Sequence, residues 1–325
     1  GNPRYSCENG FLIDRDTQTL LYAAPSSQGQ PIPAVRRLGD SALDNWKPAG
    51  NEIRLPDTLE SIGPYALDGQ YTGDFSPLAA LILPDGVREL SDCSIYGCWE
   101  IQLLRFPATL TEIPAYCVAN CGLGAVEIPE GVTRIGEFAF YYYDWEQTEL
   151  SAVTLPASVE FVGYRAFPDE CDVTALNPQV HFETATEYAE RIPEYDWYGG
   201  EAADVLYSDG LFDYELSSRG AVLLGCSRFL NQPEVPDVLE IPAELGGTPV
   251  VAIAANALNT SESCADSLLF GIVLPEGVQR VEADAFQCCH AATQISFPST
   301  LTMLAEGSFF HVYAEIDFPN GNPRY

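Results

Sequence analysis

The sequence is poor in basic residues. Its 325 residues include 47 acidic and only 15 basic side chains, with a single lysine at position 47 and a formal net charge of -32. Phosphate backbones and anionic lipids repel such a chain at long range, which argues against nucleic acids and anionic membranes as partners. The acidic residues are scattered, so we interpret them as a solvating surface, with attraction of cationic partners or divalent cations as the alternative.

Long hydrophobic runs are also missing. No stretch of eighteen apolar residues occurs, so no transmembrane helix is predicted. The start lacks the basic segment and apolar core of a signal peptide. We expect a cytosolic chain, or a mature fragment without its targeting signal. The related phrases GNPRY (1–5) and NGNPRY (320–325) favour a segment of a longer arrangement, or a boundary between successive modules with more to follow.

Residues typical of catalytic or metal sites are scarce. The three histidines, His181, His290 and His311, are far apart, and zincin, nucleophile-elbow, Walker and dinucleotide-binding patterns do not occur. Cys288 and Cys289 precede His290, but a zinc site needs a second ligand pair that the sequence does not supply. We therefore expect no enzyme activity, and no catalytic, metal-binding or cofactor-binding residues.

What the sequence does contain is an internal repeat. Nine copies place a proline directly after an apolar-x-apolar triplet, most often 22 or 23 residues apart. Alternation over so few residues indicates a short strand with one buried face, which the proline then ends. The triplets begin at Ile53, Leu81, Leu104, Val126 and Val153 in a first set, and at Leu239, Ile272, Ile295 and Ile316 in a second.

A second apolar pattern follows each proline. After Pro129, for example, the third and sixth residues are the aliphatic Val132 and Ile135, the tenth is the small Ala139 and the eleventh is the large Phe140. A unit this short cannot close its own core, so successive copies must stack in register. The pattern predicts a solenoid with a parallel sheet along one face and short helical or 3₁₀ turns along the other.

The phrases IPEGVTRIGEFAF (128–140) and LPEGVQRVEADAFQCC (274–289) resemble the BspA-like family of bacterial leucine-rich-repeat surface proteins. The repeat of that family reads approximately I-P-x-x-V-x-x-I-G-x-x-A-F-x-x-C, and the match extends over about two thirds of this chain. The resemblance implies an α/β fold, a right-handed leucine-rich-repeat solenoid.

The repeats divide the chain into two predicted blocks. Residues 1–198 would form an N-terminal hairpin, six repeats between residues 32 and 172, and a terminating segment that contains TATEYAERI (184–192). Such a segment would cover the last open repeat, as the ends of repeat stacks require. Residues 199–325 would form a second hairpin, three repeats and a partial fourth.

The ten cysteines mostly fall near one place in the repeat. Cys98, Cys121 and Cys289 lie fourteen residues after their prolines, where the unit of the resembled family ends in cysteine. They are either buried reduced thiols or disulfides between stacked neighbours, such as Cys98 with Cys121. The in-register positions favour reduced thiols.

Two surfaces are candidates for partner binding. Two copies with long proline spacings carry extra aromatic residues at the same phase of the repeat, and such insertions protrude on one edge. Tyrosine and tryptophan concentrate binding energy at interfaces, although they serve packing equally often. The second surface is the outward face of the strands, which includes Ile82 and Thr154. The candidate residues are Tyr71, Phe75, Tyr141, Tyr142, Tyr143 and Trp145 on the edge, and Arg54, Arg105 and Glu127 on the sheet face.

The resemblance implies a non-enzymatic, cell-surface or secreted protein. Its expected activity is recognition of, or adhesion to, a protein or glycan partner at a cell surface or in an extracellular matrix. Neither nucleic-acid binding nor direct membrane insertion is expected. One alternative is an architectural spacer that displays another domain without a ligand of its own. Another is an intracellular scaffold.

Overall fold

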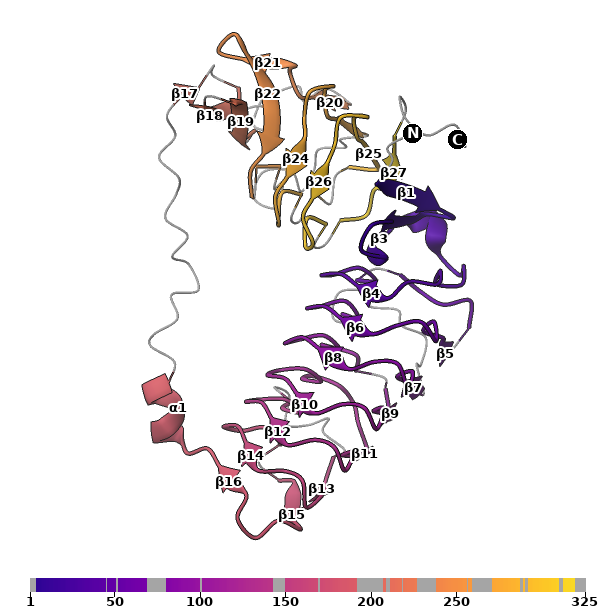
Figure 1. Ribbon diagram of the computed structural model, residues 1–325, viewed down its shortest axis with the longest axis vertical. Helices are drawn as coiled ribbons and strands as arrows, with labels where there is room; N and C mark the ends of the chain where they lie inside the picture. The colour runs from indigo at the N-terminus through magenta and orange to yellow at the C-terminus, as the bar shows by residue number, and fades with distance from the viewer. Residues whose placement is uncertain are drawn as a thin grey trace. The chain divides into compact units, whose positions relative to one another are not determined.

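The computed structural model contains two compact repeat units (Figure 1). The first unit consists of Thr17–Thr19 and Gln28–Gly199, and the second of Gly1–Asp16, Leu20–Ser27 and Gly200–Tyr325. The N-terminal hairpin therefore packs mainly with the second unit. The structure describes residues 4–44, 46–50, 52–68, 80–99, 101–142, 150–168, 170–191, 207–208, 211–217, 219–226, 238–255, 257–258, 271–286, 289, 292–309 and 312–318.

A parallel sheet runs along one face of the first unit, as the sequence predicts. Its strands follow one another in Figure 1 in the order of the repeats. They pair so that Ile53, Leu81, Leu104 and Val126 lie opposite one another. The strands are β5 (Glu52–Ile53), β7 (Ala80–Ile82), β9 (Leu103–Arg105) and β11 (Ala125–Glu127), and a second parallel pair is formed by β13 (Ala152–Leu155) and β15 (Asp172–Ala175).

A second ladder of short parallel strands replaces the helical turns that the sequence analysis expected. Each repeat contributes two residues, and the sixth residue after the proline lies in the ladder and is buried, as in Ile113, Ile135 and Val162. The strands are β4 (Arg37–Leu38), β6 (Ser61–Ile62) and β8 (Glu89–Leu90), then β10 (Glu112–Ile113), β12 (Arg134–Ile135), β14 (Phe161–Val162) and β16 (His181–Phe182). Among the described residues, helix is confined to η1 (Pro25–Ser27) and α1 (Ala185–Arg191).

The core consists of columns of equivalent side chains from successive repeats. The residues just before the prolines, Leu55, Leu83, Phe106, Ile128 and Leu155, are all buried. In seven repeats the third residue after the proline donates its backbone N–H to the proline carbonyl, as Val132 does to Pro129 at 3.0 Å. This hydrogen bond closes a turn that directs the chain towards the core. The small tenth and large eleventh residues of each copy are buried as predicted, for example Ala139 and Phe140.

A left-handed residue recurs at the ninth position after the proline, which the sequence analysis did not anticipate. Its amide donates to the next repeat, as Tyr116 does to the Glu137 carbonyl at 3.0 Å and Phe138 does to that of Tyr164 at 3.0 Å. Non-glycine residues adopt this conformation at a cost of about 1–2 kcal/mol, so the inter-repeat contacts must hold it. The residues with positive φ at this position are Tyr65, Cys93, Tyr116, Phe138, Arg165, Asp284 and Gly307.

Helix α1 packs at the far end of the first unit. It begins with a capping box: the Thr184 backbone N–H donates to the Glu187 carboxylate at 2.8 Å, and Glu187 N–H donates to Thr184 Oγ1 at 3.3 Å. The Tyr188 ring stacks on Tyr164 at 4.9 Å. Arg191, at the end of the helix, pairs with buried Glu183 at 2.8 Å and Glu137 at 3.1 Å. These contacts join the helix to two preceding repeats.

The second unit repeats this architecture. The antiparallel strands β17 (Tyr207–Ser208), β18 (Asp213–Ser217) and β19 (Gly220–Gly225) lead into a parallel ladder with β22 (Thr248–Ile253), β24 (Arg280–Val281) and β26 (Met303–Leu304). The opposite ladder contains β20 (Val238–Glu240), β23 (Gly271–Val273), β25 (Gln294–Ser296) and β27 (Glu315–Asp317). An additional strand, β21 (Glu244–Leu245), pairs with β22 across the positive-φ residues Gly246 and Gly247.

The N-terminal hairpin belongs to the same unit. Its strands are β1 (Tyr5–Glu8), β2 (Phe11–Asp14) and β3 (Thr19–Ala23). Tyr5, Leu12, Leu21 and Tyr22 are buried in one hydrophobic cluster with side chains of the C-terminal repeats.

Within the described part of the chain, no helix is long and apolar enough to cross a bilayer.

Neighbouring leucines on β9 test the column packing. Leu104 is 1% exposed and Leu103 is 51% exposed. Leu104→Ala should lower the free energy of unfolding by about 2–5 kcal/mol, because it leaves a cavity in the column. Leu103→Ala is the matched control and should change the free energy by no more than about 0.5 kcal/mol. Urea denaturation measures both, and equal losses would contradict the packing.

The Arg191–Glu183 pair should make stability depend on pH. The hydrogen bond from Arg191 lowers the pKa of Glu183 below 4.5 in the folded protein. A lowered folded-state pKa stabilises the protein above the unfolded pKa, and this contribution disappears as the pH falls through the folded pKa. Arg191→Gln should therefore destabilise at pH 7 by about 1 kcal/mol or less, since the guanidinium is solvent-exposed.

The comparison with wild type should be made by urea denaturation between pH 7 and pH 3. The difference between the two proteins is expected to shrink once the pH drops below about 4.3, the ordinary pKa of a glutamate. Arg36→Gln removes the exposed pair of Arg36 with Glu60 and serves as the control. A difference that stays constant over the whole pH range would rule out the pair as its source.

Candidate functional site

The outward face of strands β7, β9 and β11 is the candidate site, and we call it the sheet face. Two rows of outward residues cross it. Ile82, Arg105 and Glu127 lie opposite one another in the first row, and Ala80, Leu103 and Ala125 in the second. Neighbouring strands are about 4.8 Å apart, so side chains of one row can contact a common ligand.

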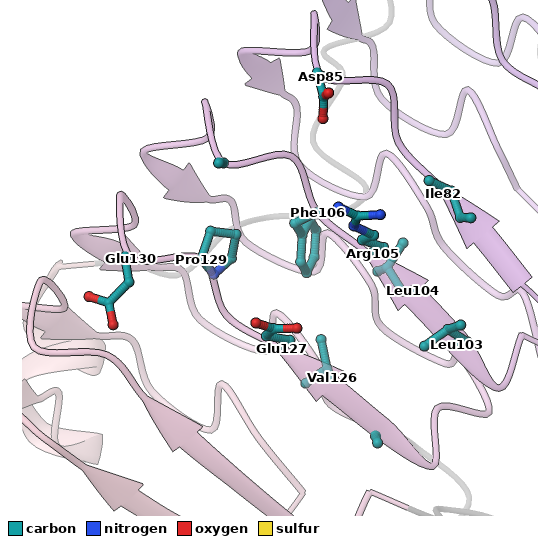
Figure 2. Close-up of a pocket in the computed structure, with 12 residues that line it drawn as sticks. Ile82, Asp85, Leu103, Leu104, Arg105, Phe106, Val126, Glu127, Pro129 and Glu130 are labelled. Atoms are coloured by element: carbon teal, nitrogen blue, oxygen red, sulfur yellow. The ribbon is translucent and has the colours of Figure 1, made fainter.

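The sheet face exposes large aliphatic side chains. Ile82 is 50% exposed and Leu103 is 51% exposed, although parallel sheets are usually covered on both faces. Figure 2 shows Ile82 and Leu103 on neighbouring strands, with Arg105 on the same strand as Leu103. They line a shallow groove of about 750 Å³ that also includes Asp85 and Glu130. Apolar surface rimmed by polar residues is typical of an interaction site.

Charged groups of both signs lie in this groove. Arg105 and Glu127 are exposed and lie in register on adjacent strands, yet neither forms an ion pair with any residue that the structure describes. Their charges are therefore available to a ligand. The carboxylates of Asp85, Glu127 and Glu130 outnumber the single guanidinium, so the groove has a negative potential that favours cationic groups.

The structure brings together only some of the residues predicted from the sequence. Arg105 and Glu127 lie in the groove, whereas Arg54 is exposed just after β5 and does not line it. Tyr141 and Tyr142 are half-buried. The Tyr141 ring packs edge-on against Phe138 at 5.4 Å and lies under the Arg165 guanidinium at 4.6 Å. Four of the predicted residues lie outside the described residues: Tyr71, Phe75, Tyr143 and Trp145.

Leu103 was missed by the sequence analysis, although a signal was present. Side chains of a strand alternate between faces, so the residue two before the outward Arg105 must also point outward. The sequence reads Leu103-Leu104-Arg105 at this point. Leu103 directly precedes the buried triplet that begins at Leu104, so the two leucines read as one apolar run.

A ladder of aromatic rings runs along the turns of the first unit. Tyr116 and Phe138 stack at 4.9 Å, Phe138 contacts Tyr164 edge-on at 5.7 Å, and Tyr164 stacks on Tyr188. Tyr116 and Phe138 occupy the left-handed ninth position of successive repeats, which places their rings face to face. Because ring faces are engaged with other rings, we assign this ladder to packing between repeats and keep the sheet face as the candidate site.

The described cysteines lie in the packed interior or at its margin, and none of these eight forms a disulfide. Burial raises the pKa of Cys117 to about 12 and that of Cys93 to about 11. Such thiols are poor nucleophiles at neutral pH. The part of the chain that the structure describes contains no group of three or more histidine, cysteine, aspartate or glutamate residues that could hold a metal ion.

Short parallel strands repeated in register, with an exposed sheet face, define a leucine-rich-repeat protein. The model of the BspA-type leucine-rich-repeat region matches residues 32–142, 69–189 and 260–322, and the chain belongs to this family. No curated protein matches the sequence of the chain.

Solved structures of bacterial proteins are similar to this chain. A leucine-rich cell-surface protein from Faecalibacterium prausnitzii A2-165 is 18% identical, with a TM-score of 0.37 and coverage of 99% of this chain and 96% of the other. A leucine-rich-repeat protein from Bacteroides ovatus ATCC 8483 is 15% identical, with a TM-score of 0.32 and coverage of 95% and 83%. The pneumococcal vaccine antigen PcpA is 14% identical, with a TM-score of 0.30 and coverage of 91% and 71%.

The buried thiols yield a direct chemical test. Cys117 and Cys121 should resist iodoacetamide at pH 8 in the native protein, because burial raises the pKa of both thiols and blocks access to them. Mass spectrometry of peptides from the alkylated protein reports each site. Both should be labelled rapidly in 8 M urea without reductant, and labelling there only after reduction would indicate a disulfide instead.

Proposed function

We propose that the chain is a non-enzymatic, cell-surface or secreted leucine-rich-repeat solenoid that binds a protein partner through the sheet face. The observation that carries this proposal is the exposure of the large aliphatic side chains Ile82 and Leu103 in the lining of the groove. Membership of the BspA-type family supports a location at the surface of a bacterial cell.

The arrangement of the sheet face favours a protein over other ligands. Protein interfaces combine a desolvated apolar centre with a polar rim that remains accessible to water. Here Ile82 and Leu103 supply exposed apolar surface, and Arg105, Glu127 and Glu130 supply charged groups in the same groove. Strands β7 and β9 each pair with a neighbour on both sides, so little ordering entropy is lost on binding there.

The charge of the groove indicates what the partner surface should contain. Three carboxylates and one guanidinium line it, and the whole chain has a net charge of -32. A partner with basic residues around an apolar patch would be attracted at long range and matched at contact. The association rate should therefore fall as the ionic strength rises.

An array of purified secreted and cell-surface proteins, with an array of glycans in parallel, tests the proposal. Binding of the fluorescent chain to proteins should be lost in Leu103→Asp, because a buried unpaired charge in the apolar centre costs several kcal/mol. Val273→Asp is the control, since Val273 is an outward aliphatic residue of β23 in the second unit and is 36% exposed. It should retain binding.

Each outcome separates the alternatives. Protein binding that survives Leu103→Asp would move recognition away from the sheet face. Binding to glycans alone would overturn the proposed class of partner. No binding on either array would leave the sheet face without a function and would favour a spacer that only displays other domains. Circular dichroism of both variants confirms that they are folded.

A further inference from the structure

The last repeat of the second unit ends in an apolar surface that the N-terminal hairpin covers. We call residues 301–318 the terminal coil. Phe309, Val312, Ala314 and Ile316 of this coil are no more than 6% exposed. They are buried in one cluster with Tyr5 and Tyr22 of the hairpin, which lie nearly the whole chain length away in sequence. Without the hairpin, the coil would expose a contiguous apolar patch.

Tyrosine hydroxyls of the hairpin satisfy backbone groups of the terminal coil. Tyr22 Oη donates to the carbonyl oxygens of Val312 at 3.1 Å and Ala314 at 2.9 Å. The backbone N–H of Leu304 donates to Tyr5 Oη at 2.7 Å. Buried backbone groups need such partners, since a buried group left without a hydrogen bond destabilises the fold. The two hydroxyls thus supply hydrogen-bond partners to three backbone groups of the terminal coil.

Ring packing and charged contacts complete the fit. The Tyr22 ring stacks on Phe309 with centroids 4.7 Å apart. Arg4 Nη1 donates to the Thr302 carbonyl at 2.8 Å. The Ser26 backbone N–H and its hydroxyl each donate to the Glu315 carboxylate at 2.5 Å. Apolar, backbone-directed and charge-assisted contacts converge on one surface, which makes the terminal coil a specific docking site for a hairpin of this sequence.

We call the contact between the hairpin and the terminal coil the joint. We propose that the joint also forms between two copies of the chain, so that the hairpin of one copy covers the terminal coil of another. Every copy carries the matching hairpin, and no covalent bond holds it to its own coil. The two surfaces are different parts of the molecule, so the contact is heterologous. Heterologous contacts add copies head to tail, as closed rings or open filaments.

Exchange between copies keeps every contact of the joint. The contacts within one chain and between two chains are the same, so the balance depends on the connecting chain and on concentration. The apparent mass should therefore rise from 35.5 kDa towards twice that value and beyond as the protein is concentrated. This inference concerns the hairpin and the terminal coil, and is independent of the partner proposed for the sheet face.

Two variants, each with one cysteine added to the ten of the sequence, distinguish exchange from closure within one chain. Ser26→Cys places a thiol on the hairpin, and Glu315→Cys places one on the terminal coil opposite it. A short bis-methanethiosulfonate reagent can link the two thiols in a mixture of these variants only if the joint forms between different copies. Wild type with the same reagent shows the background from its own cysteines.

A matched control uses Val238→Cys in place of Glu315→Cys. Val238 is at the same strand position on β20, the first strand of the ladder that ends at β27, and is 39% exposed. Denaturing gels should show a two-chain product for Ser26→Cys mixed with Glu315→Cys, well above the product with Val238→Cys. Adding Tyr22→Phe to both variants should reduce it, whereas Tyr207→Phe, on the exposed tyrosine of β17, should not.

Three results would overturn the proposal. One is a one-chain product from the double variant Ser26→Cys/Glu315→Cys with none from the mixture, which would place the joint only within a chain. The second is equal two-chain product with Val238→Cys, which would indicate random collision. The third is no crosslinking in any combination, with light scattering fixed at 35.5 kDa at all concentrations, which would show that the joint does not form.

Discussion

The structure depends on one constraint: a single repeat cannot bury its own apolar side and must use the next repeat to do so. Leu55, Leu83, Phe106, Ile128 and Leu155 are buried because each is covered by its neighbours in the stack. The same constraint makes the ends of a stack its weak points. Helix α1 packs against one such end through Tyr188 and Arg191, and the N-terminal hairpin covers another through Tyr5 and Tyr22.

In-register stacking governs the polar surface as well. It sets each outward residue beside its equivalents about 4.8 Å away, so a repeated acidic position would become a column of like charges. The second ladder varies this position after the glutamates of β8 and β10, with arginine in β12 and phenylalanine in β14. Glu112 pairs with Arg134 at 3.3 Å, and the Arg134 guanidinium lies over the Phe161 ring at 4.0 Å. A chain with few basic residues thus places one of them between an acid and an aromatic ring.

The repeat pattern predicted the strands and the buried columns, because apolar spacing directly reflects which side chains face inward. It predicted helical turns where β6, β8 and their equivalents form a second ladder, since two residues are too few to show a strand period. Arg105 and Glu127 were recognised as outward, whereas Leu103 was hidden in an apolar run. The contact of Tyr22 with Val312 joins segments with no shared sequence pattern, so only the three-dimensional structure could reveal it.

The left-handed residue at the ninth position gives each repeat a fixed corner. From Tyr65 to Phe138, the ninth residue of each repeat donates its backbone N–H to the adjacent repeat before any additional residues occur in the sequence. The extra residues of the two longest spacings in the first set follow this corner in the sequence. Evolution can therefore lengthen or shorten that segment copy by copy while the buried columns keep their alignment. Changes in length can then be confined to the segment that follows the ninth residue, without a change in the buried columns.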